Sequence, residues 1–222
     1  MKFLFIANTS WYLYNFRKNL LLHLINLGYN IYVFTPKDQY SVKLKTLGIN
    51  FIEVEFDRKN KNPFKELKLV NSFRKQIKSI KPDIIHLFTI KPVIYGAIAA
   101  RICGVKRIIC SIPGLGFIFN KKQFSQFPVK LLYKIALKSH KIITIFQNPD
   151  DQSFFKKNKL IHNNNSHLIF GSGIDINTFK SVYQGNNKKI KFGLFSRMIK
   201  EKGINEYINA AKLIKKQFGN CE

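Results

Sequence analysis

The chain has 222 residues, of which 45% are hydrophobic, 14% aromatic and 23% charged. This balance is typical of a globular protein, and it excludes a disordered, collagen-like or disulfide-scaffold chain. The formal net charge is +26, because 38 Lys and Arg residues stand against 12 Asp and Glu, and no apolar stretch approaches the roughly 18 residues that a membrane-spanning helix needs.

Short apolar runs recur along the chain, and most of them are continuous rather than alternating in polarity. Runs of this kind are typical of parallel strands that are buried on both faces of a sheet. In chain order the expected strands are Lys2–Ala7, Asn30–Thr35, Asn50–Glu55, Asp83–Phe88, Arg107–Ile112, Lys141–Phe146, His167–Phe170 and Ile190–Ser196.

Helical patterns separate these runs. Phe16, Leu20, Leu24 and Leu27 recur at helical spacing, and Gly28 follows as a helix stop. Further helices are expected at Phe64–Lys81, Val93–Cys103 and Pro128–Ser139. Alternating strands and helices predict an α/β fold with a Rossmann-like, doubly wound parallel sheet. Ligands bind beyond the carboxyl ends of the strands in such sheets, so the loops that follow the strands are where functional residues are expected.

The chain is expected to divide near residue 178. Residues 1–177 hold the predicted sheet, and residues 178–189 form a polar, Asn- and Lys-rich linker. Residues 190–222 contain one expected strand and one helix, Gly203–Gln217, which are too few to enclose a core. We therefore expect them to be the incomplete start of a second Rossmann-like domain, in a chain truncated at its carboxyl end.

The positive charge has two interpretations, an anionic partner or a biased composition. Most of the cations are Lys, and they are spread from Lys2 to Lys216 alongside abundant Asn, Ile and Phe, a mixture that A/T-rich codons alone can produce. A nucleic-acid binder more often gathers Arg on one element, so we favour compositional bias and expect no nucleic-acid partner. A field this positive still attracts anionic surfaces, including membranes and diphosphates.

The cysteines, Cys103, Cys110 and Cys221, are odd in number and have no metal-ligand spacing. They are typical of reduced, mostly buried thiols in a cytosolic protein, and no metal site is expected. The apolar start, Phe3–Ala7, is too short for the core of a signal peptide and is interrupted by Asn8. These features predict a cytoplasmic protein.

A polar and aromatic segment, Asn8–Arg17, follows the first expected strand and runs into a helix. The backbone N–H groups at that helix start, together with Arg17, could hold an anion. The alternative is an ordinary helix cap at Asn15 with Arg17 in solvent, and the segment alone does not separate the two.

Two glycine-containing segments follow later strands. Gly114 and Gly116 let the backbone approach a ligand closely, although a plain turn explains the same residues and the third glycine of a dinucleotide-binding fingerprint is missing. Gly171 and Gly173 favour a hinge between domains over a phosphate cradle, because no Lys-Ser/Thr pair follows them as in a P-loop.

The most basic loop, Ser196–Gly203, joins the last expected strand to the last helix. Arg197 and Lys202 would converge at the amino end of that helix, where two cations and the helix dipole suit a diphosphate. The competing interpretation is an ordinary basic loop in a chain rich in Lys.

No catalytic group emerges from the sequence. His86, near the carboxyl end of a strand, is interpreted as a satisfied structural residue. Asp150 and Asp151 follow Asn148-Pro149 and indicate the start of a helix rather than a catalytic pair. There is no Ser–His–Asp set or metal cluster, and the catalytic residues stay unassigned.

Taken in order, these segments resemble a bacterial glycosyltransferase of the family 4 type, with the two Rossmann-like domains of the GT-B architecture. No single motif is specific, whereas the ordered set is. The likeness is greatest to transferases that add an N-acetylhexosamine to an undecaprenyl-diphosphate-linked sugar in capsule, O-antigen or glycan assembly. The matching segments run across nearly the whole chain and are Tyr14–Arg17, Asn62–Phe64, Pro82–His86, Gly114–Gly116, Phe146–Asp151, Gly171–Asp175, Arg197 and Lys202–Gly203.

The resemblance implies a role for each part of the chain. Residues 190–222 would begin the domain that binds a nucleotide sugar, UDP-linked, with Arg197 and Lys202 holding the donor diphosphate and stabilising the leaving group. The resemblance also implies retention of the anomeric configuration, no cofactor, no obligatory metal, and docking on the anionic inner face of a membrane. Residues 1–177 would bind the lipid-linked glycan acceptor, and the residues implied to line that cleft are Asn8, Ser10, Tyr14, Asn15, Arg17, Gly114 and Gly116.

Two departures from the family pattern limit these implications. Ile112-Pro113 stands where many members carry a His or an acidic residue, and the family's later pair of glutamates does not occur in these residues. We therefore expect the 222-residue chain to be inactive alone. The alternative is a non-catalytic half that binds acceptor or a partner chain supplying the missing domain. A related GT-B epimerase is a further alternative, although the basic loop with Arg197 and Lys202 fits transfer at least as well, and a nucleic-acid binder ranks last.

Overall fold

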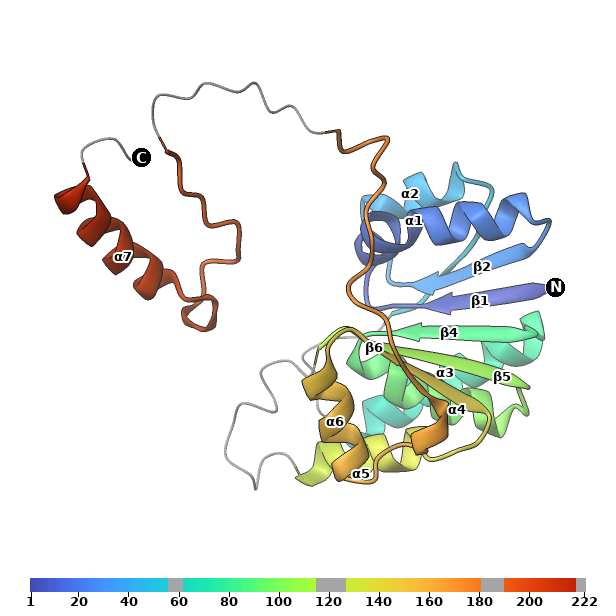
Figure 1. The fold of residues 1–222 in the computed structure, drawn as a ribbon. Helices are drawn as coiled ribbons and strands as arrows, with labels where there is room; N and C mark the ends of the chain where they lie inside the picture. Colours follow the sequence, from blue (N-terminus) through green and yellow to red (C-terminus); the bar gives the residue numbers. More distant parts are fainter. Residues whose placement is uncertain (56–61, 115–126, 181–189, 219–222) are drawn as a thin grey trace. The chain divides into compact units, whose positions relative to one another are not determined.

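Strands from seven of the apolar runs pair side by side in one sheet of the computed structural model (Figure 1). The structure describes residues 1–55, 62–114, 127–180 and 190–218. It separates into two compact units, Met1–Asp175 and Ile176–Glu222, and the sheet belongs to the first. The predicted α/β, Rossmann-like fold is therefore confirmed.

Every neighbouring pair of strands in the sheet is parallel, and the order is β3-β2-β1-β4-β5-β6-β7. The order reverses its direction of growth between β1 and β4, and in register Phe5 of β1 lies between Val33 and His86. The seven strands predicted for this unit are all present, with ends within two residues of the expected ones. They are β1 (Lys2–Ile6), β2 (Asn30–Thr35), β3 (Asn50–Glu53), β4 (Ile84–Phe88), β5 (Arg107–Ile112), β6 (Ile142–Phe146) and β7 (Ser166–Leu168).

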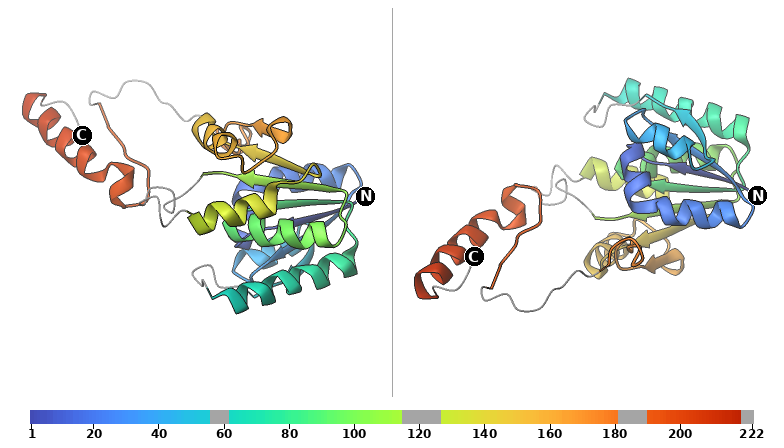
Figure 2. Two further views of the ribbon diagram at one scale, coloured as in Figure 1. Left: turned by 90° about the horizontal axis from the view of Figure 1, so that it is seen from below. Right: turned by 90° about the horizontal axis from the view of Figure 1, so that it is seen from above.

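Helices cover both faces of the sheet (Figure 2). On one face lie α1 (Ser10–Asn26) and α2 (Tyr40–Lys45). On the other lie α3 (Pro63–Ile80), the π-helical turn η1 (Pro92–Gly96), α4 (Ala97–Ile102), α5 (Phe127–Leu137) and α6 (Pro149–Lys157). The helix α2 was not predicted from the sequence, because its six residues are too few to show a helical period.

Side-chain caps explain where three of the helices begin. Asn62 and Asn148 precede Pro63 and Pro149, and their side chains accept hydrogen bonds from Phe64 N and Asp151 N. Proline suits the first helical position because it lacks the N–H that would go unpaired there. The predicted helix start at Asp150 and Asp151 is confirmed. The third cap is Thr9, whose hydroxyl accepts from Tyr12 N, so α1 begins several residues before the predicted cap at Asn15.

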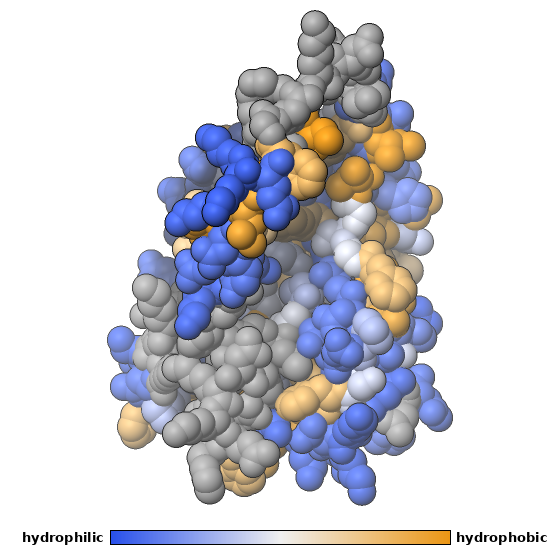
Figure 3. Space-filling model, turned by 60° about the vertical axis from the view of Figure 1, so that its left-hand side comes forward, coloured by the Kyte–Doolittle hydropathy of each residue, from blue (hydrophilic) through white to orange (hydrophobic). Residues whose placement is uncertain are grey.

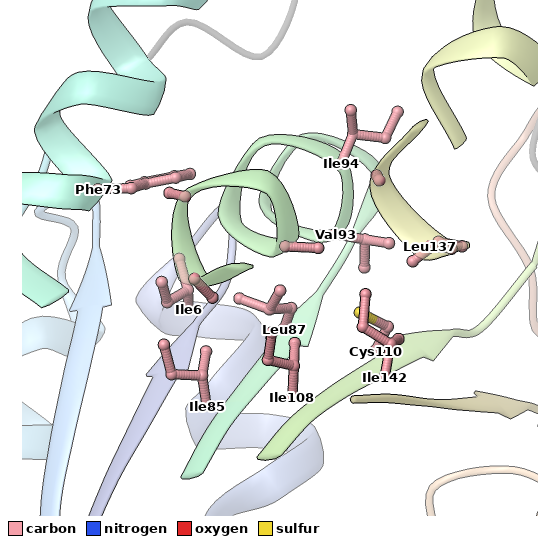
Figure 4. Packing of buried hydrophobic residues seen from close by; sticks show 14 of the residues in the cluster. Ile6, Phe73, Ile85, Leu87, Val93, Ile94, Ile108, Cys110, Leu137 and Ile142 are labelled. Carbon is pink, nitrogen blue, oxygen red and sulfur yellow. The ribbon is translucent and has the colours of Figure 1, made fainter. Parts of the chain in front are cut away.

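The core of the first unit has two parts, one on each face of the sheet. The larger lies under α3, η1, α4, α5 and α6, and Figure 4 shows side chains of β1, β4, β5 and β6 directed toward these helices. The smaller lies under α1 and α2 and includes Phe5, Leu13 and Phe88. Cys110 is buried in the larger part and both Cys103 and Cys110 are free thiols, whereas Cys221 lies outside the described residues.

The second unit contains α7 (Ile204–Gln217), which confirms the predicted helix. The predicted strand at Ile190–Ser196 is wrong, because only Ile190 makes a bridge and residues 191–195 have no regular structure. A strand needs hydrogen-bonded neighbours, and none pairs along these residues in the part of the chain that is described. No described residue from Ile176 onward is buried. Among the described residues, no helix is long and apolar enough to cross a bilayer.

Candidate functional site

A cavity of about 300 Å³ lies at the carboxyl edge of the sheet, where the strand order reverses between β1 and β4. We call it the switch-point cavity. Residues that follow β1, β4 and β5 line it, because parallel strands bring their carboxyl ends to the same edge. Its lining includes Asn8, Thr89, Lys91, Ser111, Gly114 and Tyr133.

The loop after β4 enters this cavity in a strained conformation. Thr89 has a φ of 69°, in the left-handed region that a β-branched residue rarely adopts. Its hydroxyl donates to the carbonyl of Phe88, and its own carbonyl accepts from Val93 N at 2.9 Å. These bonds hold the turn, which carries Lys91 to the wall of the cavity. Strain of this kind is more common at functional sites than elsewhere.

Lys91 is held by a mostly buried ion pair. Its Nζ lies 2.5 Å from Glu66 Oε1, and the two side chains are 16% and 10% exposed. Lys91 also lines a second cavity, of about 740 Å³, at the carboxyl ends of β2 and β3. We call this the Glu66 cavity. Burial, then the nearby charge of Glu66 and a hydrogen bond to Glu66, raise the pKa of Tyr95 to about 12, so this phenol stays protonated and donates to the carboxylate of the pair.

A third cavity, of about 310 Å³, lies on the sheet face that carries α1, and we call it the α1-face cavity. His86 lies there, with its Nε2 2.8 Å from Ser111 Oγ and its ring against those of Phe5 and Phe88. Burial, and then the charge of Arg17, lower its pKa to about 3. His86 is therefore a neutral, hydrogen-bonded residue, and its structural interpretation is confirmed.

Arg17 also lines the α1-face cavity, two turns from the start of α1. Its guanidinium lies 4.9 Å from the centre of the Phe88 ring and donates to Tyr12 Oη, while its Nε is buried without a hydrogen-bond partner. It does not join the N–H groups at the helix start. There, Trp11 N donates to Asp38 Oδ2 at 3.0 Å, so a carboxylate of the protein already occupies part of the place where the sequence allowed an anion to bind.

Three other residues implied for the acceptor cleft face elsewhere. Ser10 is buried, and its hydroxyl lies 2.7 Å from Thr35 Oγ1 and 2.9 Å from Ser41 Oγ, which ties α1 to β2 and α2. Tyr14 packs against Tyr40. Asn15 donates back to Trp11 O within α1. None of the three lines any of the cavities described above.

The predicted glycines take different places. Gly114 lines the switch-point cavity together with Asn8, so the fold brings two of the implied cleft residues together, whereas Gly116 lies outside the described residues. Gly171 and Gly173 have φ values of 67° and 72°, which favour glycine. They lie shortly before Asp175, where the first unit ends, and their role as a hinge stays a prediction.

The residues expected to hold a diphosphate lie in the second unit. Arg197 precedes the short helix η5 (Lys200–Lys202), and Gly203 follows it with a φ of 71°. Arg197 and Lys202 are both exposed. Within the described ranges, no group of three or more His, Cys, Asp and Glu side chains could hold a metal ion.

Residues 2–148 match the family model described as "Glycosyl transferase 4-like". The chain belongs to the glycosyl transferase 4-like family. The chain is 26% identical to the N,N'-diacetylbacillosaminyl-diphospho-undecaprenol alpha-1,3-N-acetylgalactosaminyltransferase of Campylobacter jejuni, over 97% of its own length and 61% of the relative's. It is 28% identical to an Escherichia coli UDP-Gal:alpha-D-GlcNAc-diphosphoundecaprenol alpha-1,3-galactosyltransferase, over 61% of its length and 35% of the relative's.

Solved structures show the same fold as this chain. A glycosyltransferase from Rickettsia africae superposes with a TM-score of 0.67 at 16% identity, over 97% of this chain and 57% of that one. Anabaena HepE in complex with UDP-glucose superposes with a TM-score of 0.64 at 18% identity, over 95% of this chain and 57% of that one. A putative UDP-N-acetylglucosamine 2-epimerase from Listeria monocytogenes superposes with a TM-score of 0.61 at 14% identity, over 100% of this chain and 60% of that one. Because the epimerase shares the fold, fold alone does not distinguish transfer from epimerisation.

Thr89, Lys91, Glu66 and Ser111 were not predicted as site residues from the sequence. Lys91 follows a correctly predicted strand, so the rule that ligands lie beyond carboxyl ends marks its loop. A Lys in a Lys-rich chain carries no signal of its own. Glu66 lies in the first turn of α3, and only the three-dimensional structure brings it to Lys91.

Proposed function

We propose that this chain binds the acceptor for a glycosyltransferase that moves a sugar from a nucleotide sugar to an undecaprenyl-diphosphate-linked glycan. The observation that carries the proposal is the switch-point cavity, which lies where ligands bind in doubly wound sheets. Family membership supports transfer, and the names of the two curated relatives both describe acceptors that join a sugar to undecaprenol through a diphosphate. The activity is proposed for a protein whose relatives are longer than this chain.

The acceptor sugar would lie in the switch-point cavity. Asn8 offers an amide that both donates and accepts hydrogen bonds, as sugar hydroxyls require. Gly114 has no side chain to fill the space. Burial raises the pKa of Tyr133, so its hydroxyl remains a hydrogen-bond donor.

The donor would be a nucleotide sugar, UDP-linked, bound through the second unit. Arg197 and Lys202 would hold its diphosphate, and their charge would stabilise the leaving group as the glycosidic bond breaks. The transfer would retain the anomeric configuration and use no cofactor and no obligatory metal. Arg197 and Lys202 are exposed, and no described residue of the second unit is buried, so this part lacks the packing that would hold them in place. We therefore expect no turnover by the 222-residue chain alone.

Binding to the acceptor would take place at the cytoplasmic face of a membrane. In the face shown in Figure 3, hydrophilic residues are spread among separate hydrophobic patches. The exposed aromatic residues Trp11 and Phe16 lie on α1, which contains no acidic residue. Cations and exposed aromatic rings on one helix suit an anionic headgroup region.

The test is calorimetric titration with a soluble acceptor analogue, N-acetylglucosaminyl diphosphate linked to farnesol. We expect binding by the 222-residue chain and a loss of at least about tenfold in Gly114→Leu, whose side chain would fill the cavity. A Cβ at Gly114 comes no closer than 4.0 Å to Asp151 Oδ2, so the variant is expected to fold. Ser79→Leu, on the exposed surface of α3, is the control. Equal binding by Gly114→Leu and the parent chain would place the acceptor elsewhere.

Turnover is tested separately with UDP-GalNAc and UDP-Gal on the same analogue. No product is expected from the chain alone, and clear product formation would contradict that expectation. Product formed only after addition of a chain carrying a donor-binding domain would favour a split enzyme.

A further inference from the structure

The α1-face cavity has a polar end and an apolar end. Its polar end lies toward the carboxyl ends of the strands, where Arg17, Ser111 and Gln147 line it. Toward the amino ends the lining is hydrocarbon and includes Phe3 and Leu24. No acidic side chain is among the described residues that line this cavity. Binding sites for small molecules often combine an apolar wall with a few polar groups in this way.

The apolar end is open to solvent. Strands of a parallel sheet are usually covered on both faces, yet on this face Ile109 and Ile145 are only half-buried and Ile169 is 53% exposed. His86 lies beside Ile109 in register and is neutral, so it adds no charge to this surface. A hydrocarbon ligand would remove this apolar surface from water, which favours binding.

Arg17 is the one cation among the described residues of this lining. Its guanidinium lies 4.9 Å from the centre of the Phe88 ring and donates to Tyr12 Oη, and these contacts orient it. A guanidinium carries five N–H donors, which is more than these contacts use, and its fork matches phosphate oxygens. The polar end therefore suits an anionic group, whereas the rest of the cavity suits hydrocarbon.

The α1-face cavity adjoins the switch-point cavity. Ser111, the last residue but one of β5, lines both of them. A ligand in the switch-point cavity would therefore reach Arg17 by extending past the carboxyl end of β5. Along that path come a site for a sugar, a cation and an apolar wall. A lipid-linked acceptor has its parts in the same order, which are sugar, diphosphate and prenyl chain.

We propose that the α1-face cavity binds the first isoprene units of the acceptor's prenyl chain, an inference that rests on the proposed function. The diphosphate would lie at Arg17, and the hydrocarbon would follow the apolar wall. Leu20 lines this cavity and is 37% exposed, and Phe16 is exposed on the same helix. The rest of the prenyl chain would therefore leave the cavity along α1, the helix that we propose meets the membrane.

A helix of another protein, or of a second copy of this chain, fits the cavity less well. Such a helix would cover the apolar end, but it would also bury Arg17 beside Ser111 and Gln147, neither of which is a carboxylate. Burying a cation without a counter-charge is costly. A diphosphate supplies that counter-charge and carries the hydrocarbon in the same molecule, so the polar groups gathered at one end favour an amphiphile.

The test compares N-acetylglucosaminyl diphosphate linked to ethanol with the same compound linked to farnesol, at concentrations where both are monomeric. The two analogues share the sugar and the diphosphate and differ only in the hydrocarbon. The parent chain is expected to bind the farnesyl analogue at least about tenfold more tightly in calorimetric titration, because its isoprene units leave water. Equal affinities in the parent chain would overturn the proposal.

The double variant Leu20→Gln/Ile169→Gln makes the apolar wall polar without changing its charge. Both side chains are already exposed, so the variant is expected to fold. Neither residue lines the switch-point cavity, so affinity for the ethyl analogue should stay within about twofold of the parent's. The preference for the farnesyl analogue should fall at least about fivefold. The matched control is Leu67→Gln/Ile102→Gln, at exposed positions of α3 and α4, and it should keep the parent's preference.

Arg17→Gln tests the place of the diphosphate. It should weaken both analogues by a similar factor, at least about fivefold, because both carry the diphosphate. A loss confined to the farnesyl analogue would contradict this placement. A farnesyl analogue with a diazirine in its first isoprene unit locates the hydrocarbon directly. Crosslinks to residues of the α1-face cavity are expected, and crosslinks confined to the Glu66 cavity would show that the chain lies elsewhere.

The remaining outcomes separate the two proposals. If the parent chain binds neither analogue, the proposed function itself fails; if it binds both equally, only the inference about the prenyl chain fails. A farnesyl preference that survives in Leu20→Gln/Ile169→Gln also contradicts the inference. If the parent chain sediments as a dimer that this variant converts to a monomer with the preference unchanged, the face is an interface between copies instead.

Discussion

The imidazole of His86 lies among aromatic rings on β4, with Ser111 as its hydrogen-bond partner. Its pKa is lowered from 6.5 to about 3, first by burial and then by Arg17. Below pH 6.5 the His86 imidazole therefore binds a proton in the unfolded chain but not in the folded chain. The free energy of unfolding consequently decreases as the pH falls from 6.5 toward 3.

We expect His86 to remove about 2 kcal/mol of unfolding free energy between pH 7 and pH 5, at about 1.4 kcal/mol per pKa unit. Urea unfolding of the parent chain and of His86→Gln at both pH values isolates this contribution as the difference in their pH dependence. His23→Gln, on the exposed side of α1, should keep the parent's dependence. An unchanged dependence in His86→Gln would mean that the imidazole is not held neutral.

Ser10 illustrates how a single hydroxyl can connect three elements. Its Oγ lies within hydrogen-bond distance of Thr35 Oγ1, Ser41 Oγ and Pro36 O. Ser10→Ala removes these bonds at a buried position, and we expect it to cost about 1–3 kcal/mol of unfolding free energy. Urea denaturation with the exposed Ser79→Ala as control measures this cost, and equal midpoints would show that Ser10 does not hold α1 to its neighbours.

At the scale of elements, the packing of η1 against β4 depends on the absence of a Cβ at Gly96. A Cβ at Gly96, in η1, would lie 2.8 Å from Leu87 Cδ2, and Leu87 is fully buried on β4. Gly96→Ala should therefore cost about 1–3 kcal/mol by overpacking. Thermal and urea unfolding measure the loss. In the double variant Gly96→Ala/Leu87→Ala, the total loss of unfolding free energy should be smaller than the sum of the losses in the two single variants, because the smaller side chain at position 87 leaves room for the new Cβ. Additive losses would show that the two groups do not collide.

The elements that the sequence predicted well are those whose signal is local. Buried parallel strands are continuous apolar runs, and Asn148-Pro149 is a cap followed by a first helical residue, so both are legible without the fold. An anion site at the start of α1 was one of two interpretations of the sequence, and the position is in part occupied because Asp38 reaches Trp11 N from 27 residues away. The strand expected near Ile190 has an apolar sequence but no neighbour to pair with among the described residues.

The candidate site likewise contains residues that local sequence patterns predict and residues that only the fold brings together. Asn8 and Gly114 come together as expected, because the rule that parallel strands end at one edge needs only the strand positions. The pairing of Glu66 with Lys91 spans 25 residues and depends on how α3 lies against the sheet, which no local pattern records.

At the scale of the whole molecule, the first unit contains every buried residue of the described chain. A protein that ends at Asp175 should therefore fold alone, with a melting temperature within about 2 °C of the 222-residue chain, because about 1 kcal/mol shifts the melting temperature of a domain this size by 2–4 °C. Calorimetry of both proteins decides this. A drop well beyond that range would mean that residues after 175 stabilise the first unit.

The left-handed turn at Thr89 makes it possible to separate selection for stability from selection for ligand binding. A β-branched residue with a φ of 69° costs stability that Gly or Asn at the same position would recover. A library selected only for resistance to heat or protease should therefore replace Thr89 early. A library selected for binding of the acceptor analogue should keep it if the shape of the switch-point cavity depends on this side chain. The residue that is retained at position 89 in each library would then show whether stability or acceptor binding determines the residue in this loop.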